Sequence, residues 1–242
     1  MPDIPRSLQL ALTWEAVSSG SHIALRDLQG DDEPHLLGGA PLVPALAQLA
    51  PHAVWCIVPA PADPQGLPSG IATAAIEAGE ALVLLTADGA RVLIPQVQVF
   101  GSELEPGAFV RWRLLDASGM VSPSSSPGES GLLLLQTMRE AIDELTRLDV
   151  AQERPDLREA FLDLALPVPA SLVDALEPLE ERRRDLLLRA LRLLAIVDLA
   201  SQDHGTAVTL GQITTRTAVM RDLERSARQS VAVGSFRRLT TT

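Results

Sequence analysis

A run of Ser, Pro and Gly at residues 122–131 separates two parts of the chain that differ in hydrophobic periodicity. Before it, apolar and polar residues alternate over short segments, which is typical of half-buried strands. After it, apolar residues recur every three or four positions, which is typical of amphipathic helices. The pattern predicts an α+β protein in which an N-terminal mixed β-sheet with short helices (residues 1–121) precedes a C-terminal helical bundle with a basic tail (132–242).

The first predicted strands come from this alternation near the N-terminus. In residues 8–14, three Leu and one Trp occupy every second position and would share one face of a strand. Residues 22–28 are expected to be its partner, with the Ser/Gly segment 18–21 as the turn. The proline-bounded segment 41–51 has room only for a short helix.

Residues 53–86 are interpreted as one β-α-β unit. The apolar run 53–58 predicts a buried strand, and 81–85 predicts the next one. Between them, Ser69 is the expected N-cap of an Ala-rich helix that ends at Gly79. Strands joined by a crossover helix in one sheet run parallel, with a right-handed crossover. We therefore expect these two strands to be parallel.

A hairpin is predicted next. The dipeptide at 88–89, Asp-Gly, favours a tight turn into a strand over residues 92–100. Pro95 lies inside this strand and has no backbone N–H to donate, which indicates an edge or a bulge. A further turn at 105–107 leads into a strand at 109–114, whose alternate residues, beginning with Val110, are expected to face inward.

The part after residue 131 is predicted to be helical throughout. Helices are expected over 132–148, from Pro155 onward, from about Pro178 through a nearly all-apolar second half, and over 206–233 with Gly234 as its stop. The two long helices are expected to form an antiparallel pair. The residues expected to face inward are Leu135, Met138, Ile142, Leu145 and Leu148 in the first of these helices, and Ile213, Met220, Ala227 and Val231 in the last.

Missing residue types exclude several classes of enzyme. All 20 basic residues are Arg, and the chain contains no Lys, Asn or Tyr. Without Lys there is no Schiff-base or pyridoxal chemistry, no GxxxxGK[ST] phosphate loop and no protein kinase. No nucleophile elbow or paired-carboxylate motif is present. We predict no catalytic residue and no cofactor, and we favour a protein that is not an enzyme.

The histidines and the cysteine give no metal-binding pattern. His22, His35, His52 and His204 lie outside any metal-ligand spacing. On one strand, His52 and Cys56 would be about 13 Å apart, too far for a shared ion. Cys56 is interpreted as a buried small hydrophobe, and as the single cysteine it fits a reducing cytoplasm.

Charge is distributed unevenly along the chain. The net charge is -11, and residues 1–131 hold 5 Arg against 14 acidic residues, residues 132–206 hold 9 against 15, and residues 207–242 hold 6 against 2. The acidic body argues against binding to nucleic acid or to a membrane surface, because its field repels phosphates. The most apolar stretch, 186–200, is too short and too charged to span a bilayer, and no signal peptide is predicted.

Two groups of residues are candidate binding sites. Ser69 and Gly70 begin a predicted helix, where backbone N–H groups are able to hold a phosphate or another anion. The second group consists of Arg residues near the C-terminus: Arg221, Arg225 and Arg228 on one helix face, then Arg237 and Arg238 in the tail. These form either a solvated face with a frayed tail or a docking surface for the acidic first half, within the chain or on another subunit.

Four stretches resemble a group of uncharacterised actinobacterial proteins. They are PAPADPQGLPSGIATAAIEAGEA, LTRLDVAQERPDLREA, LLAIVDLASQDHGTAVT and LERSARQSV, and the resemblance covers most of residues 53–233. It rests on packing and turn residues and includes no catalytic signature. Because that group carries no assigned activity, no functional residue is carried over. The resemblance implies a cytoplasmic bacterial protein with the same two-part layout.

The function predicted from these observations is a non-enzymatic interaction or self-assembly protein. Its expected partners are further copies of itself or an acidic protein surface, reached through apolar helix faces and charge complementarity. The alternative is a small-molecule or anion-binding protein, or an enzyme, with its site near Ser69 and Gly70. Weak binding of acidic ligands or nucleic acid by the Arg tail is a third hypothesis.

Overall fold

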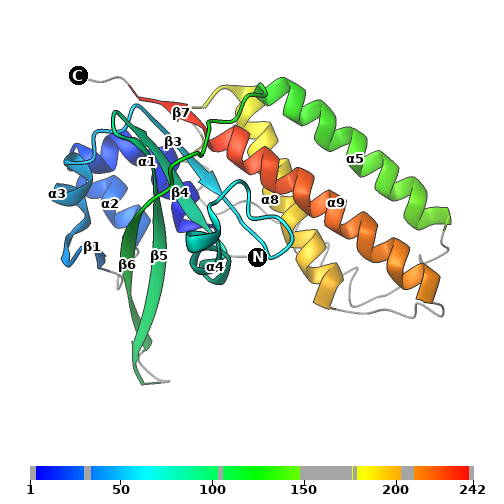
Figure 1. Ribbon diagram of the computed structural model, residues 1–242, viewed down its shortest axis with the longest axis horizontal. Coiled ribbons are helices and arrows are strands. Elements are labelled where there is room, and N and C mark those ends of the chain that lie inside the picture. Colours follow the sequence, from blue (N-terminus) through cyan, green and yellow to red (C-terminus); the bar gives the residue numbers. More distant parts are fainter. Residues whose placement is uncertain are drawn as a thin grey trace. The chain divides into compact units, whose positions relative to one another are not determined.

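A computed structural model describes most of the chain (Figure 1). Its residues form an α+β protein that divides into two compact units. We call them the sheet unit and the helical unit. The residues described are 4–29, 34–102, 106–147, 176, 179–202 and 210–239. Of these, 4–123, 176 and 235–239 belong to the sheet unit, and 124–147, 179–202 and 210–234 belong to the helical unit.

The sheet unit is built on a seven-stranded sheet with the order β2-β1-β6-β5-β4-β3-β7 (Figure 1). Neighbouring strands are antiparallel except β1 and β6, which are parallel. The strands β3 and β4 hold much of the core, because β3 is buried along its whole length. The strands are β1 (His35–Leu37), β2 (Ala40–Pro41), β3 (Ala53–Ile57), β4 (Ala81–Thr86), β5 (Gly89–Gly101), β6 (Pro106–Asp116) and β7 (Arg237–Arg238).

The helices described in full in the sheet unit are α1 (Arg6–Ser18), α2 (His22–Gln29), α3 (Leu42–Ala47) and α4 (Ser69–Ala78). The helix α1 packs on β3, β4 and β5 and contacts α2 and α3, whereas α4 contacts β5. The short helix predicted between the prolines of segment 41–51 is confirmed as α3.

The predicted strands at 8–14 and 22–28 are wrong, because both segments are helices. The alternation in the first segment is incomplete, since Ala11 is apolar and fully buried beside Leu10 and Leu12. A helix buried over a wide face accommodates such a run as well as a strand does. Its buried residues Ser7, Leu10, Ala11, Trp14 and Val17 recur at helical spacing.

The strands predicted at 53–58 and 81–85 are confirmed as β3 and β4, but their predicted parallel pairing is wrong. They are antiparallel, with Ile57 opposite Ala81. The chain therefore leaves and returns at the same end of the sheet. A ten-residue helix covers about 15 Å, and the preceding loop, residues 58–68, is long enough to span that distance in the opposite direction.

The ends of α4 match the prediction at one terminus only. Gly79 ends the helix in the left-handed conformation (φ 73°), and its N–H donates to the carbonyl of Ile76. Ser69 is the first helical residue and not the N-cap, which is Pro68. No side-chain hydrogen bond caps this N-terminus.

The hairpin between β4 and β5 turns one residue earlier than predicted, since Gly89 already pairs with Thr86. Pro95 pairs with Trp112 of β6, whereas the pairing of β5 with β4 ends at Leu93. Its missing N–H therefore costs no ladder hydrogen bond on the β4 side, which confirms the predicted edge position. On β6, Val110 and Trp112 face inward as predicted.

The helical unit contains three described helices, α5 (Pro127–Arg147), α8 (Glu181–Gln202) and α9 (Leu210–Ser235). The first of them begins inside the predicted linker 122–131, because Ser126 and Glu129 form a capping box. The Ser126 N–H and hydroxyl each donate to the Glu129 carboxylate at 2.8 Å, and the Glu129 N–H donates to Ser126 Oγ at 3.2 Å.

Packing within the helical unit corrects several predicted details. Ile142 and Ile213, expected inward, are 60% and 45% exposed, whereas Ala227 and Val231 are fully buried as expected. Gly234 does not stop the last helix, which continues to Ser235. The helix predicted from Pro155, together with Leu148 and His204, lies outside the described residues.

Candidate functional site

The C-terminal segment, Ser235–Arg238, is tied to the edge of the sheet. Its strand β7 pairs antiparallel with the first two residues of β3, Ala53 and Val54. Two residues further along β3, the N–H of Cys56 donates to Ser235 Oγ at 2.9 Å, so a side chain extends the contact with β3 on the N-terminal side of β7. Phe236 packs against Trp55 with ring centroids 6.0 Å apart. In the described residues this segment is therefore part of the sheet edge.

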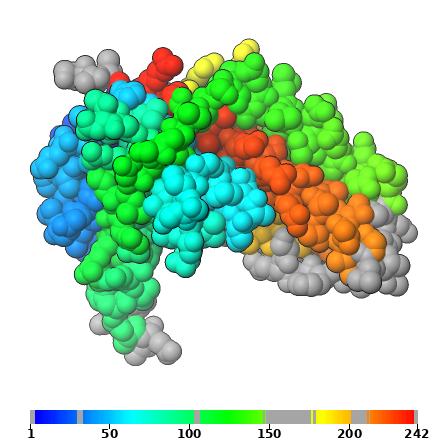
Figure 2. All heavy atoms as spheres, viewed as in Figure 1, coloured from blue at the N-terminus to red at the C-terminus, as the bar shows by residue number. Residues whose placement is uncertain are grey.

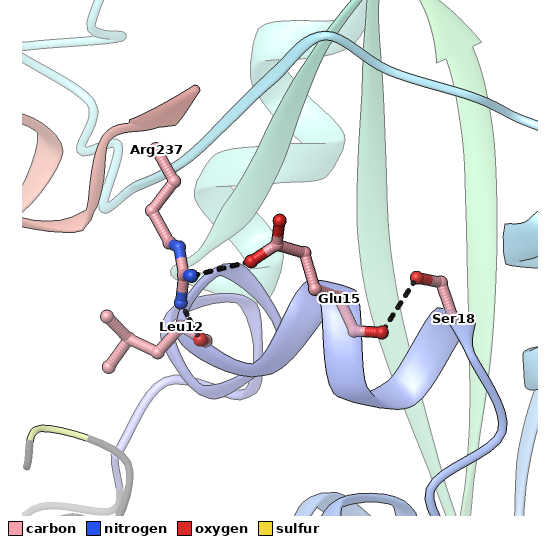
Figure 3. A network of polar contacts seen from close by, with 4 residues as sticks. All are labelled: Leu12, Glu15, Ser18 and Arg237. Carbon is pink, nitrogen blue, oxygen red and sulfur yellow. Dashed lines mark hydrogen bonds and ion pairs between the residues drawn. The ribbon is translucent and has the colours of Figure 1, made fainter. Parts of the chain in front are cut away.

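Arg237 connects this segment to α1 (Figure 3). Its guanidinium donates to the backbone carbonyl of Leu12 and, at 2.8 Å, to the carboxylate of Glu15. In the same helix, the hydroxyl of Ser18 donates to the backbone carbonyl of Glu15 at 3.3 Å. Arg237 thus meets an acidic residue of the first half within the chain, which was one of the two docking arrangements considered for it.

We expect the Leu12 contact of Arg237 to matter more than its ion pair. Arg237→Ala should lower the free energy of unfolding by about 1–3 kcal/mol, because a charged hydrogen bond to a carbonyl is lost. Glu15→Ala should cost less than about 1 kcal/mol, since Glu15 is half exposed and its pair is screened by water. Urea unfolding of both variants and of the double variant measures this difference. Equal losses in the two single variants would contradict it.

The Arg residues of α9 do not form one free surface. Arg221 is exposed, whereas Arg225 pairs with Asp222 at 2.8 Å. Arg228 is only 8% exposed and pairs with Glu224 one turn earlier. Arg238, in β7, is exposed. Of the five predicted docking residues, Arg221 and Arg238 are the two whose side chains are open to solvent and have no ion pair among the described residues.

Ser69 and Gly70 lie exposed at the start of α4. A Cβ added to Gly70 would meet no described atom within 4 Å. The anion site at this helix start remains a prediction from the sequence.

Glu80 is a buried carboxylate that the sequence analysis did not single out. Its carboxylate accepts the N–H of Ser7 at 2.6 Å, which caps α1, whose N-cap residue Pro5 provides no side-chain cap. Burial raises the pKa of Glu80, while hydrogen bonds from Ser7 and Arg6 lower it in part. Only the tertiary structure brings residue 80 to this helix, so no local pattern signals the contact.

His35 and Cys56 both serve packing in the sheet unit. The indole N–H of Trp112 donates to His35 Nδ1 at 3.2 Å, and both side chains are buried. Because it accepts this bond, Nδ1 carries no proton. Burial, followed by the charge of Glu80, raises the pKa of the Cys56 thiol well above its ordinary value, which keeps it protonated. Among the described residues, no three potential ligands are grouped as a metal site would require.

The outer part of the β5–β6 hairpin forms a surface that the sequence analysis also missed. We call it the outer ribbon, residues 96–101 paired with 106–111. It projects beyond the rest of the sheet unit (Figures 1 and 2). Val97, Val99 and Phe100 are 44%, 75% and 53% exposed. The sequence signal was present, because Gln96–Phe100 alternates Gln with apolar residues and contains no charge.

Aromatic contacts order one face of this ribbon. The Phe100 ring covers Gly107, where an added Cβ would lie 2.6 Å from the ring. Phe100 and Phe109 have ring centroids 6.1 Å apart, and the Arg111 guanidinium lies 5.1 Å from the Phe109 centroid. The ribbon therefore presents ordered apolar and cationic groups to solvent.

Fold and surface together define a class: a two-unit α+β protein with a projecting β-ribbon. Family models of the Rv1486c-like protein match the chain in succession, the N-terminal domain over residues 11–127 and the C-terminal domain over residues 128–232. The chain belongs to this Rv1486c-like family, which confirms the resemblance found in the sequence. Comparison with curated proteins and with solved structures gave no match. No described helix combines the length and the apolar character needed to cross a membrane.

Proposed function

We propose that this chain is a non-enzymatic interaction protein that self-associates. The observation that supports the proposal is the exposure of Val97, Val99 and Phe100 together on the outer ribbon. Single exposed apolar residues are ordinary, but a group of them on a projecting element is typical of a protein contact. Full burial of each such side chain contributes about 1.5–3 kcal/mol.

Charge favours the ribbon as the contact between two copies. Each chain carries a net charge of -11, so two copies repel one another at long range. The described residues of the ribbon include no acidic residue, and Arg111 is exposed there. Contact through the paired strands of the ribbon therefore brings no two acidic side chains of these strands together.

Sedimentation velocity of the full chain tests the proposal. At micromolar concentrations we expect a species larger than the monomer, whose fraction rises with concentration. Val99→Arg should shift the equilibrium to the monomer, because association would then have to bury a charged side chain in place of an apolar one. Val121→Arg is the matched control, since Val121 is 81% exposed but lies outside the ribbon. A wild-type chain that stays monomeric at every concentration would overturn the proposal.

A second contact, through the Arg residues of α9, is tested with a separate variant. Arg221→Glu combined with Arg225→Glu should weaken association only where the C-terminal Arg residues meet an acidic surface of another copy. If this variant associates like the wild type, the ribbon alone accounts for self-association.

Two finer features belong to the same proposal. We place the boundary between a sheet-bearing part and a helical part within residues 122–131. We also place the protein in the cytoplasm. A single buried cysteine, Cys56, supports the second point because it suits a reducing compartment.

A further inference from the structure

We propose that two copies of this chain pair edge to edge through β5, antiparallel and centred on Gln98, so that their sheets become continuous. This inference rests on the proposed function and names the contact that would carry it. It follows from the direction of the backbone groups in β5, from the absence of protection on that edge and from the symmetry of its side chains.

The backbone of β5 alternates between its two neighbours. The carbonyl of Ala90 accepts the N–H of Ala117, which follows β6, so the even-numbered residues of β5 point their backbone groups toward β6. The odd-numbered residues point toward β4. Pairing with β4 ends at Leu93, and therefore Val97 and Val99 direct their N–H and C=O groups to an edge that no described strand occupies.

This edge lacks the features that usually protect an exposed strand. Natural edges carry charged side chains, prolines or bulges that prevent pairing with other chains. Between Gln96 and Phe100 there is no charge, no proline and no break in the register with β6. Pro95 blocks the edge only at the point where the exposed segment begins. The segment is thus suited to β-strand addition.

Its side chains are complementary to a second copy of themselves. An antiparallel arrangement about Gln98 places Val97 opposite the partner's Val99, and Gln98 opposite the partner's Gln98. On one face valines then meet valines, and on the other Gln98 lies opposite the partner's Gln98 and Gln96 opposite the partner's Phe100, without opposing like charges. Such a two-fold contact uses the same surface on both copies, as closed dimers do. A second copy is therefore the occupant that this edge fits.

A cysteine on the predicted two-fold axis tests the register. Gln98 would form a non-hydrogen-bonded pair with its counterpart, with Cα atoms about 4.5 Å apart, which is within the range of a disulfide. Under mild oxidation, Gln98→Cys should give a covalent dimer on non-reducing gels. Gln96→Cys is the matched control on the same face, because its two copies would lie about 13 Å apart. The native Cys56 is buried.

A proline at Val99 tests the hydrogen bonds. Val99→Pro removes an N–H that points to the free edge and leaves the ladder with β6 complete, as Pro95 already does. We expect self-association to weaken at least about tenfold, which corresponds to roughly 1.4 kcal/mol. Circular dichroism of each variant checks that the chain is folded.

The outcomes separate this inference from the proposed function. If the wild type self-associates but Gln98→Cys cross-links no faster than Gln96→Cys, edge pairing is overturned and the interaction proposal stands. If Val99→Pro associates as the wild type does while folded, edge pairing is likewise overturned. A wild type that is monomeric throughout overturns both.

Discussion

Trp55→Ala should lower the free energy of unfolding of the sheet unit by about 3–5 kcal/mol, as truncation of a buried aromatic residue does. Trp55 is 2% exposed in the middle of β3, a strand buried along its whole length. It also packs against Phe236, which follows α9 directly. The substitution therefore leaves a cavity and removes the aromatic contact beside the β3–β7 pairing.

Urea unfolding followed by the fluorescence of Trp14 and Trp112 measures this effect, because all three tryptophans belong to the sheet unit. Trp55→Phe is the matched control and should cost clearly less, since a ring remains in the site. A loss below about 1 kcal/mol for Trp55→Ala would show that the site collapses around the missing side chain.

Gly234→Val is expected to destabilise the helical unit by about 1–3 kcal/mol, the usual effect of adding atoms to a packed core. A Cβ at position 234 would lie 2.6 Å from Cγ of Leu187, and Leu187 is fully buried. Cγ is a branch point near the backbone, so it has little freedom to move away. The glycine allows α9 to approach α8 closely.

Gly211→Val is the control for this prediction, because the same helix offers a glycine whose added Cβ would meet nothing within 4 Å. It should change stability by no more than about 0.5 kcal/mol. Far-UV circular dichroism follows the helices, while tryptophan fluorescence follows only the sheet unit. Similar losses for the two variants would mean that helix propensity, and not the contact with Leu187, determines the effect of Gly234→Val.

Local patterns predicted the strands β3 and β4 and the existence of the long helices correctly. They failed at residues 8–14, where a mostly apolar segment fits either periodicity. Period alone cannot distinguish a short buried strand from a helix with a wide buried face. The choice depends on what covers the segment, and here α1 packs on β3, β4 and β5.

The candidate site shows the same division. The charge distribution left two alternatives for Arg237, a frayed tail or docking against the acidic first half, and the structure places Glu15 beside it. Which acid it meets depends on the pairing of β7 with β3, a contact between residues far apart in the sequence. The buried cap that Glu80 provides to α1 depends on tertiary contact in the same way.

The sequence by itself determined the class of fold and the apolar segments that form the core. It also determined the absence of Lys, Asn and Tyr and the division between an acidic body and a basic end. These follow from composition and from local periodicity, which neighbouring residues express directly. Tertiary structure alone decided that β3 and β4 run antiparallel, that Gly234 serves helix packing, and that the outer ribbon leaves an edge exposed. Each depends on which segments meet in space, because pairing and burial are properties of two surfaces and not of one.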